Sequence, residues 1–144
     1  YRGKGRLGLT PASRVTIRLP ASLIHKFLVL AGQQLTLGTD SLRLGIPQPH
    51  ALTPTPALYA HLVTTRNGQD EERFDSEIAR QLSELGIEGS SQRGPRRSFT
   101  VRDKKVVAHT LLVSKLTAEE SIRLQEHGLG GRRKLGCGIF LPAK

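Results

Sequence analysis

The stretch TAEESIRLQEHGLGGRRKLGCGIFLPA, residues 117–143, decides the fold because it runs from a helix through a loop into a strand. Thr117 and Glu120 have the spacing of a capping box, which predicts a helix that begins just after Thr117. Gly128 suits the end of that helix. The apolar residues 139–141 predict a short terminal strand. The basic, glycine-rich segment between them is therefore a connection rather than a free tail.

The segments upstream of this stretch predict a regular alternation of strands and helices from residue 58 on. LYAHLVTT (58–65) indicates a strand, and DEERFDSEIARQLSELG (70–86) indicates a helix with one apolar stripe. EGSSQRGPRR (88–97) is typical of a polar, basic loop, and SFTVRDKKVVAHTLLV (98–113) predicts a hairpin that turns at Asp103-Lys104. The order strand, helix, strand, strand, helix, strand is the split βαβ pattern of ferredoxin-like domains.

The first third of the chain predicts only part of a second such unit. RVTIRLP (14–20) alternates cations with aliphatic residues and predicts a strand, ASLIHKFLVLAG (21–32) a short helix, and QLTLGTDSLRLG (34–45) two short strands. We therefore expect an α+β fold of tandem ferredoxin-like (split βαβ, RRM-like) domains, the first one incomplete in this chain. The expected boundaries are residues 1–50 for the latter part of the N-terminal domain, 51–57 for a Pro-rich linker, and 58–144 for the C-terminal domain with its glycine-rich loop.

The charge of the chain points to a polyanionic partner. Lys and Arg number 22 against 12 Asp and Glu, which gives a formal charge of +10 and a pI near 10.7. Nucleic acid is the first expectation and an anionic membrane surface the second. No carboxylate precedes Asp40, whereas six cations do: Arg2, Lys4, Arg6, Arg14, Arg18 and Lys26. The charge is therefore segregated along the chain.

The cysteine content and the hydropathy of the chain bear on where in the cell the protein is expected. The one cysteine, Cys137, excludes an intramolecular disulfide and a cysteine-rich zinc site. We expect a reducing, cytoplasmic location. No apolar run approaches 18 residues, so a membrane-spanning segment is not expected.

The residues of the glycine-rich loop allow three explanations: a nucleotide-binding loop, a solvated tail, or another kind of loop that holds phosphates. A Walker loop would need GxxxxGK[ST], which is absent, and a Rossmann loop would need GxGxxG between a strand and a helix, whereas this loop follows a helix. A solvated tail is disfavoured by the apolar residues that end the chain. Glycine N–H groups can approach phosphates closely, and so a phosphate-holding loop remains.

A second basic cluster, RGPRRSFTVRDKK (93–105), lies on the predicted hairpin and has a single carboxylate, Asp103. A solvated hairpin tip is an equally good explanation for this cluster taken alone. Joined to the same sheet as the glycine-rich loop, however, it could help to hold an RNA backbone without reading its sequence.

The run LTAEESIRLQEHGLGGRRKLGCGIFLP resembles the C-terminal signature of the CRISPR repeat-processing endoribonucleases of the repeat-associated mysterious protein superfamily. The resemblance covers the second unit, and RVTIRLP…GIPQPHAL fits the latter half of the first. It implies metal-independent cleavage of precursor crRNA in the repeat beside a hairpin, by attack of a 2′-hydroxyl on the adjacent phosphate. It also implies that the enzyme stays bound to the 3′ hairpin of the crRNA, with Cascade backbone subunits as partners, no membrane and no cofactor.

The expected RNA-binding residues fall into two sets. Glycines shape the loop and three cations contact phosphate: Gly128, Gly130, Gly131, Gly136 and Gly138, with Arg132, Arg133 and Lys134. The hairpin contributes the second set: Arg96, Arg97, Lys104 and Lys105. We expect no metal ligands.

No catalytic residue is assigned from the sequence. Each histidine has an ordinary structural explanation, such as strand packing for His109 or helix-end dipole compensation for His127; the others are His25, His50 and His61. The family histidine generally lies in or just after the early helical region of the first domain, so the resemblance places the catalytic residue upstream of Tyr1. Tyr59 could stack on a base, although strand tyrosines usually pack.

Two other kinds of protein remain possible. A non-catalytic subunit could cap a guide RNA within a Cascade-type assembly. A generic RRM-like binder would stack bases on aromatic side chains of its sheet, and the aromatic-poor strands of this chain count against it.

Overall fold

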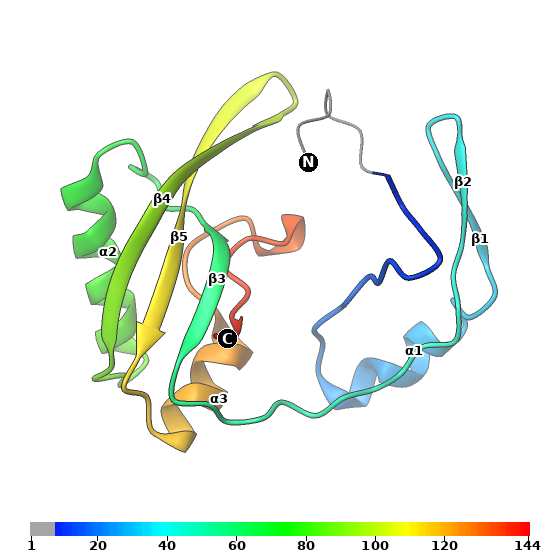
Figure 1. The fold of residues 1–144 in the computed structure, drawn as a ribbon. Helices are drawn as coiled ribbons and strands as arrows, with labels where there is room; N and C mark the ends of the chain where they lie inside the picture. Colours follow the sequence, from blue (N-terminus) through cyan, green and yellow to red (C-terminus); the bar gives the residue numbers. More distant parts are fainter. Residues whose placement is uncertain (1–7) are drawn as a thin grey trace. The chain divides into compact units, whose positions relative to one another are not determined.

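The computed structural model describes residues 8–144, so Arg2, Lys4 and Arg6 of the basic N-terminal segment lie outside the described residues. The chain divides into two compact units, Tyr1–His50 and Ala51–Lys144. Figure 1 shows the elements of each unit. The assignment of the first unit to the latter part of a ferredoxin-like domain, and of residues 51–57 to a linker, stays a prediction.

The first unit contains a short helical segment and one hairpin. η1 (Ala21–Leu23) leads into α1 (Ile24–Leu28), and β1 (Gln34–Leu37) pairs antiparallel with β2 (Asp40–Arg43). The hairpin is closed by hydrogen bonds between residues 32–33 and Leu44. The predicted helix is shorter than expected, and the two predicted strands are confirmed.

The strand predicted for residues 14–20 is wrong. These residues have no ladder partner among residues 8–144, and Val15 and Ile17 are 72% and 51% exposed. The alternation of cations and aliphatic residues fits an extended chain, but a strand also needs a neighbouring backbone to which its N–H and C=O groups can bond.

The second unit contains a four-stranded antiparallel sheet in the order β4-β5-β3-β6. Its elements follow one another as β3 (Leu58–Val63), α2 (Glu71–Glu84), β4 (Ser90–Val101), β5 (Lys104–Ser114), α3 (Ala118–His127), η2 (Arg133–Leu135) and β6 (Leu141–Pro142). This order and these pairings are those of the split βαβ, ferredoxin-like fold, which confirms the predicted pattern.

Side chains at the N-termini explain where the two long helices begin. Asp70 accepts a hydrogen bond of 3.1 Å from the N–H of Arg73 at the start of α2. At α3, Thr117 and Glu120 form the predicted capping box. Glu120 also accepts from the N–H of Glu88, and this bond and the one from Thr117 lower the pKa of Glu120. No helix within residues 8–144 has the length and apolar character needed to cross a bilayer.

The core lies between both helices and one face of the sheet. Leu58 and Ala60 of β3 are fully buried in one cluster with side chains from β5, both helices and the terminal segment: Leu111, Val113, Phe74, Ile78, Leu82, Leu124 and Phe140. The other face of β3 is partly open, and Tyr59 there is 38% exposed. The core therefore fixes the sheet against α2 and α3, and Leu129 of the loop after α3 is buried in the same cluster.

The polar loop predicted for residues 88–97 is wrong, because most of it forms the first half of β4. A bulge between Arg93 and Arg96 accommodates Pro95, which has no N–H to donate to the ladder. A Cβ on Gly94 would lie 2.1 Å from the hydroxyl of the buried Thr110, so any larger residue there would force the Thr110 side chain to move. Edge strands are often polar, and for this reason composition alone indicated a loop.

The hairpin between β4 and β5 turns one residue earlier than predicted. Val101 pairs with Lys104, and Arg102 and Asp103 both have positive φ, at 46° and 64°. Two central residues in the left-handed region are typical of a type I′ turn, whose twist matches that of the flanking strands.

Candidate nucleic-acid interface

The glycine-rich loop joins α3 to β6, as expected, and it is fastened to the end of β3. The N–H of Gly131 donates to the carbonyl of Thr64 at 2.8 Å, and the Thr64 hydroxyl donates to the carbonyl of Gly131 at 3.1 Å. The N–H of Gly138 donates to the carbonyl of Leu62 at 2.7 Å. The loop is therefore an ordered part of the second unit and not a tail.

Three of the glycines allow close approach of backbone to backbone. Gly128, Gly130 and Gly138 have positive φ, and a Cβ at any of them would collide with a carbonyl oxygen. At Gly130 that Cβ would lie 2.3 Å from the oxygen of Thr64. Gly131 has room for a side chain, while Gly136 has room but a φ of 84°. Gly128, Gly130, Gly136 and Gly138 thus shape the loop through their backbone conformation, whereas nothing in the loop geometry requires glycine at position 131.

The glycine N–H groups of the loop are engaged within the protein. Their acceptors lie on four different segments: Leu124 for Gly128, the Gln81 side chain for Gly130, Thr64 for Gly131, Arg133 for Gly136 and Leu62 for Gly138. A phosphate would therefore have to be held by the side chains of the loop cations rather than by these N–H groups.

The three cations of the loop are exposed. Arg132 has left-handed φ and ψ of 55° and 35°, and η2 follows it as a single turn that carries Arg133 and Lys134. Arg133 also donates to the carbonyl of Gly130 at 3.4 Å. Burial raises the pKa of the Cys137 thiol, although the nearby Arg132 acts in the opposite direction. Cys137 is thus a small buried side chain and not an activated nucleophile.

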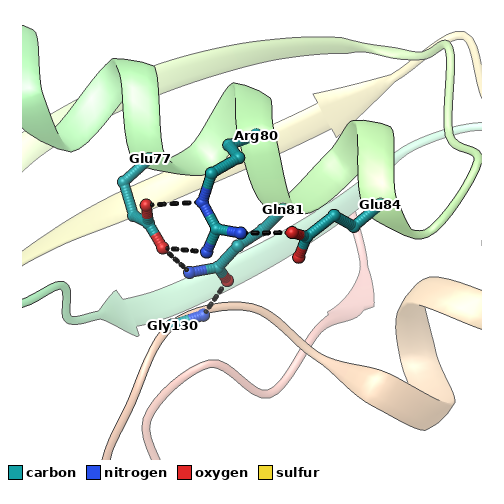
Figure 2. A network of polar contacts seen from close by, with 5 residues as sticks. All are labelled: Glu77, Arg80, Gln81, Glu84 and Gly130. Atoms are coloured by element: carbon teal, nitrogen blue, oxygen red, sulfur yellow. Dashed lines mark hydrogen bonds and ion pairs between the residues drawn. The ribbon is translucent and has the colours of Figure 1, made fainter.

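A polar network on α2 holds the loop from the other side (Figure 2). Gln81 accepts from the N–H of Gly130 at 2.7 Å and donates to Glu77 at 2.6 Å. Arg80 pairs with Glu77 and with Glu84. Hydrogen bonds from Arg80 and then from Gln81 lower the pKa of Glu77 to about 2, so this carboxylate is ionised at neutral pH.

The second predicted set lies on a two-stranded arm. β3 pairs with β5 only as far as Val63 and His109, whereas β4 and β5 stay paired to Val101 and Lys104. The five residue steps from His109 to Lys104 correspond to a two-stranded arm about 17 Å long, at about 3.4 Å per residue. Val106, Val107 and Ala108 within it are buried, so the β5 strand of the arm is exposed only at the turn and the residues next to it. The arm carries one carboxylate, Asp103, and five cations: Arg96, Arg97, Arg102, Lys104 and Lys105.

The four predicted arm residues do not share one face. Arg96 lies opposite His109, whose ring packs 4.6 Å from that of Phe74 on the helix-covered face. Lys105 has the same parity as His109 and lies on that face too. Arg97, opposite Ala108, and Lys104 lie on the other face. The structure thus divides this set into two pairs.

Both basic sets belong to the same end of the sheet. The loop is bonded to Thr64, directly after the last pair of β3 with β5, and the arm extends beyond that same pair. The split βαβ topology expected from the sequence implied that the hairpin and the loop are not distant, although they are about thirty residues apart in the chain.

Among residues 8–144, no histidine lies in a catalytic arrangement. His109 is fully buried, and its Nε2 lies 3.0 Å from the carbonyl of Gly68. His127 ends α3 and bonds through Nδ1 to the carbonyl of Arg123, as dipole compensation predicts. The remaining three are exposed: His25, His50 and His61.

Sequence reasoning missed Gln81 and Arg66. Gln81 is an ordinary polar residue on a helix, and only its contact with Gly130 reveals a role. Arg66 lies three residues after the end of β3 and, together with Arg132, lines a hollow formed by the residues after β3, one face of α2 and the glycine-rich loop. The sequence offered one signal for Arg66, namely a cation just after a predicted strand.

These features define a ferredoxin-like α+β unit whose last helix and last strand are joined by an ordered, basic, glycine-rich loop. Residues 1–144 match the model of the family described as Cas6 Crispr. The chain belongs to this Cas6 family. It is also 42% identical over 143 residues to the CRISPR-associated endonuclease Cas6 of Myxococcus xanthus (strain DK1622), across 99% of this chain and 58% of that protein. The chain thus spans little more than half the length of this curated relative.

Proposed function

We propose that the protein to which this chain belongs is a CRISPR endoribonuclease that cleaves precursor crRNA in the repeat beside a hairpin. The observation that carries the proposal is the ordered basic loop of a Cas6-family chain, with three exposed cations on a backbone fixed by hydrogen bonds. Cations on a rigid support can hold phosphates in a defined register.

The proposed reaction needs no metal ion. The 2′-hydroxyl attacks the adjacent phosphorus, its proton passes to a base, and the 5′-oxygen leaves with a proton from an acid, which forms a 2′,3′-cyclic phosphate. Cationic side chains stabilise the negative charge that develops on the phosphorane. We propose that the proton carrier lies outside residues 8–144. Within these residues His109 is buried, Nδ1 of His127 is held by the helix end, and no hydrogen bond positions the exposed rings of His25, His50 and His61.

Cleavage in the presence of a chelator tests this reaction. Full-length protein and repeat RNA are incubated with EDTA, and the product ends are analysed. We expect one cut beside the hairpin with a cyclic-phosphate end, whereas activity that is lost in EDTA and restored by a divalent cation would overturn metal independence. Residues 1–144 alone are expected to bind the same RNA without cutting it.

Binding variants test the role of the loop separately. Replacing Arg132 and Arg133 with Ala should weaken hairpin binding, because two phosphate-facing charges are lost. Unchanged affinity at moderate salt would remove the loop from the RNA interface. We further propose that the protein stays on the crRNA 3′ hairpin as a subunit of a Cascade complex, which co-purification of crRNA with Cascade backbone subunits would test.

A non-catalytic RNA cap is the second candidate. The ordered basic loop that supports the enzyme supports this candidate equally, because the loop accounts for RNA binding and not for cleavage. Tight binding of repeat RNA by the full-length protein, without any cleavage, would select this candidate over the enzyme.

A further inference from the structure

A hollow of about 580 Å³ lies beside the glycine-rich loop on the second unit. Three segments line it: the residues after β3, one face of α2 from Arg73 to Gln81, and the loop from Gly130 to Arg132. No aromatic side chain is among its lining residues. The hollow is therefore not built to stack a base, and polar side chains determine what it can bind.

The residues that line the hollow carry a net positive charge, even when arginines that form ion pairs within the protein are left out. Four arginines face one carboxylate, Glu77, whose charge is matched by Arg80. Arg73 has a long, exposed contact of 3.4 Å with Asp70. No ion pair involves Arg66 or Arg132 within residues 8–144, and both are exposed. Two guanidinium groups from different segments thus remain available to an anion.

The backbone that carries these two arginines is fixed. Gly131, which precedes Arg132, exchanges two hydrogen bonds with Thr64, and Gly130 bonds to Gln81. Arg66 follows Thr64 by two residues, and the next turn is closed by a bond from the N–H of Asp70 to the carbonyl of Asn67. Little backbone conformational freedom is therefore lost when both arginines engage one ligand.

We propose that this hollow binds one backbone phosphate of the RNA through the guanidinium groups of Arg66 and Arg132. A guanidinium group can donate two parallel N–H bonds to two oxygens of one phosphate, which makes arginine well suited to this ligand. The hollow lies at the end of the sheet from which the basic arm extends, so a bound phosphate there would sit on a route from the loop towards the arm. The inference rests on the proposed function, because it assumes that repeat RNA is the ligand.

The salt dependence of RNA affinity tests this site. Fluorescence anisotropy with repeat RNA, from about 50 to 200 mM salt, gives the slope of log K against log salt. Arg66→Ala should weaken binding about tenfold and reduce the slope by roughly 0.7 to 0.9, as expected for one lost phosphate contact. Its unfolding midpoint should match that of the wild type, because the replaced side chain is exposed.

Lys144→Ala is the matched control. Lys144 is exposed, and the adjacent Ala143 bonds to Ala57, at the start of β3 and away from the hollow. The variant loses one positive charge, as Arg66→Ala does, but at the opposite end of β3. We expect its RNA affinity and its salt slope to be close to those of the wild type.

A double-mutant cycle tests whether the two arginines share one phosphate. Arg132→Gly is the second change, since glycine adopts the left-handed backbone there without strain. If both residues grip one phosphate, the double variant should lose clearly less affinity than the product of the two single losses. Arg66→Ala combined with Lys104→Ala should be multiplicative within about twofold.

The outcomes separate this inference from the proposed function. If Arg66→Ala behaves like Lys144→Ala while Arg132→Gly still weakens binding, the hollow does not hold an RNA phosphate and the loop role stands. Binding of inorganic phosphate that Arg66→Ala abolishes without any change in RNA affinity would also overturn the inference. If RNA affinity is insensitive to every one of these changes, the proposed RNA interface itself fails.

Discussion

The side-chain amide of Gln81 is held at both ends, because its oxygen accepts from the N–H of Gly130 at 2.7 Å and its nitrogen donates to Glu77 at 2.6 Å. The two contacts fix which end of the amide faces the loop. The glycine-rich loop is thereby attached to α2, as it is to β3 through Thr64. The position of Arg132 thus depends on residues that are themselves neutral.

Gln81→Leu should loosen the loop. Leucine keeps much of the side-chain volume but offers no acceptor, which leaves the part-buried N–H of Gly130 without its partner. We expect a loss of about 1–2 kcal/mol in the free energy of unfolding, measured with urea. RNA affinity should fall as well, since the loop cations lose their fixed support. Ser83→Ala on the same helix is the control, and equal stability of the two variants would contradict the role of Gln81.

The acid dependence of stability should contain a contribution from Glu77. Its pKa is lowered from 4.5 to about 2 by hydrogen bonds from Arg80 and Gln81. A depressed carboxyl pKa stabilises the fold above the unfolded value, and this stabilisation is lost as pH falls from 4.5 through 2. In Glu77→Gln, the urea midpoint should therefore fall less between about pH 5 and 3 than in the wild type. An identical fall in both proteins would show that the network does not act through this ionisation.

Neighbouring glycines should respond very differently to alanine. Gly130→Ala places a Cβ 2.3 Å from the oxygen of Thr64 at a φ of 73°, so we expect a loss of about 2–4 kcal/mol in unfolding free energy. Gly131→Ala meets its nearest atom at 3.7 Å and should stay close to wild type. Comparable losses in urea unfolding would mean that the loop does not pack on Thr64 as described.

The helices and the order of elements in the second unit could be predicted because their signals are local. Thr117 and Glu120 are three residues apart and cap α3, while Phe74, Ile78 and Leu82 repeat at helical spacing. Hydrogen bonds and packing within one helix depend on neighbours in the sequence, which the sequence displays directly.

Features that depend on distant partners could not be predicted. Residues 14–20 alternate like a strand but have no ladder partner in the described chain, whereas the polar residues that begin β4 are paired with β5. The contact between Gln81 and Gly130 joins residues 49 positions apart. Composition alone identified the basic loop. It could not show that the glycine N–H groups of the loop are bonded within the protein, because most of their acceptors are distant in the sequence.

The two faces of the β4–β5 arm should differ in their importance for RNA. Arg96 and Lys105 lie on the helix-covered face, and Arg97 and Lys104 lie on the opposite one. The variants Arg96→Ala/Lys105→Ala and Arg97→Ala/Lys104→Ala each remove two charges from exposed positions. If RNA contacts one face, one double variant should weaken binding at least about tenfold more than the other. Equal losses would indicate an arm inserted between RNA strands, and wild-type affinity in both would remove the arm from the interface.

A substitution of Arg132 should change the stability of the protein and its RNA affinity in opposite directions. Its φ of 55° lies in the left-handed region, where a residue with a Cβ costs about 1–2 kcal/mol relative to its usual conformations. Arg132→Gly should therefore be as stable as the wild type or up to about 1 kcal/mol more stable in urea unfolding. RNA affinity should nevertheless fall about tenfold, because a phosphate contact is lost. Arg133→Ala, which keeps the left-handed arginine, should weaken binding without any gain in stability. An Arg132→Gly protein that is more stable and binds RNA as tightly as the wild type would show that the strained arginine does not serve RNA recognition.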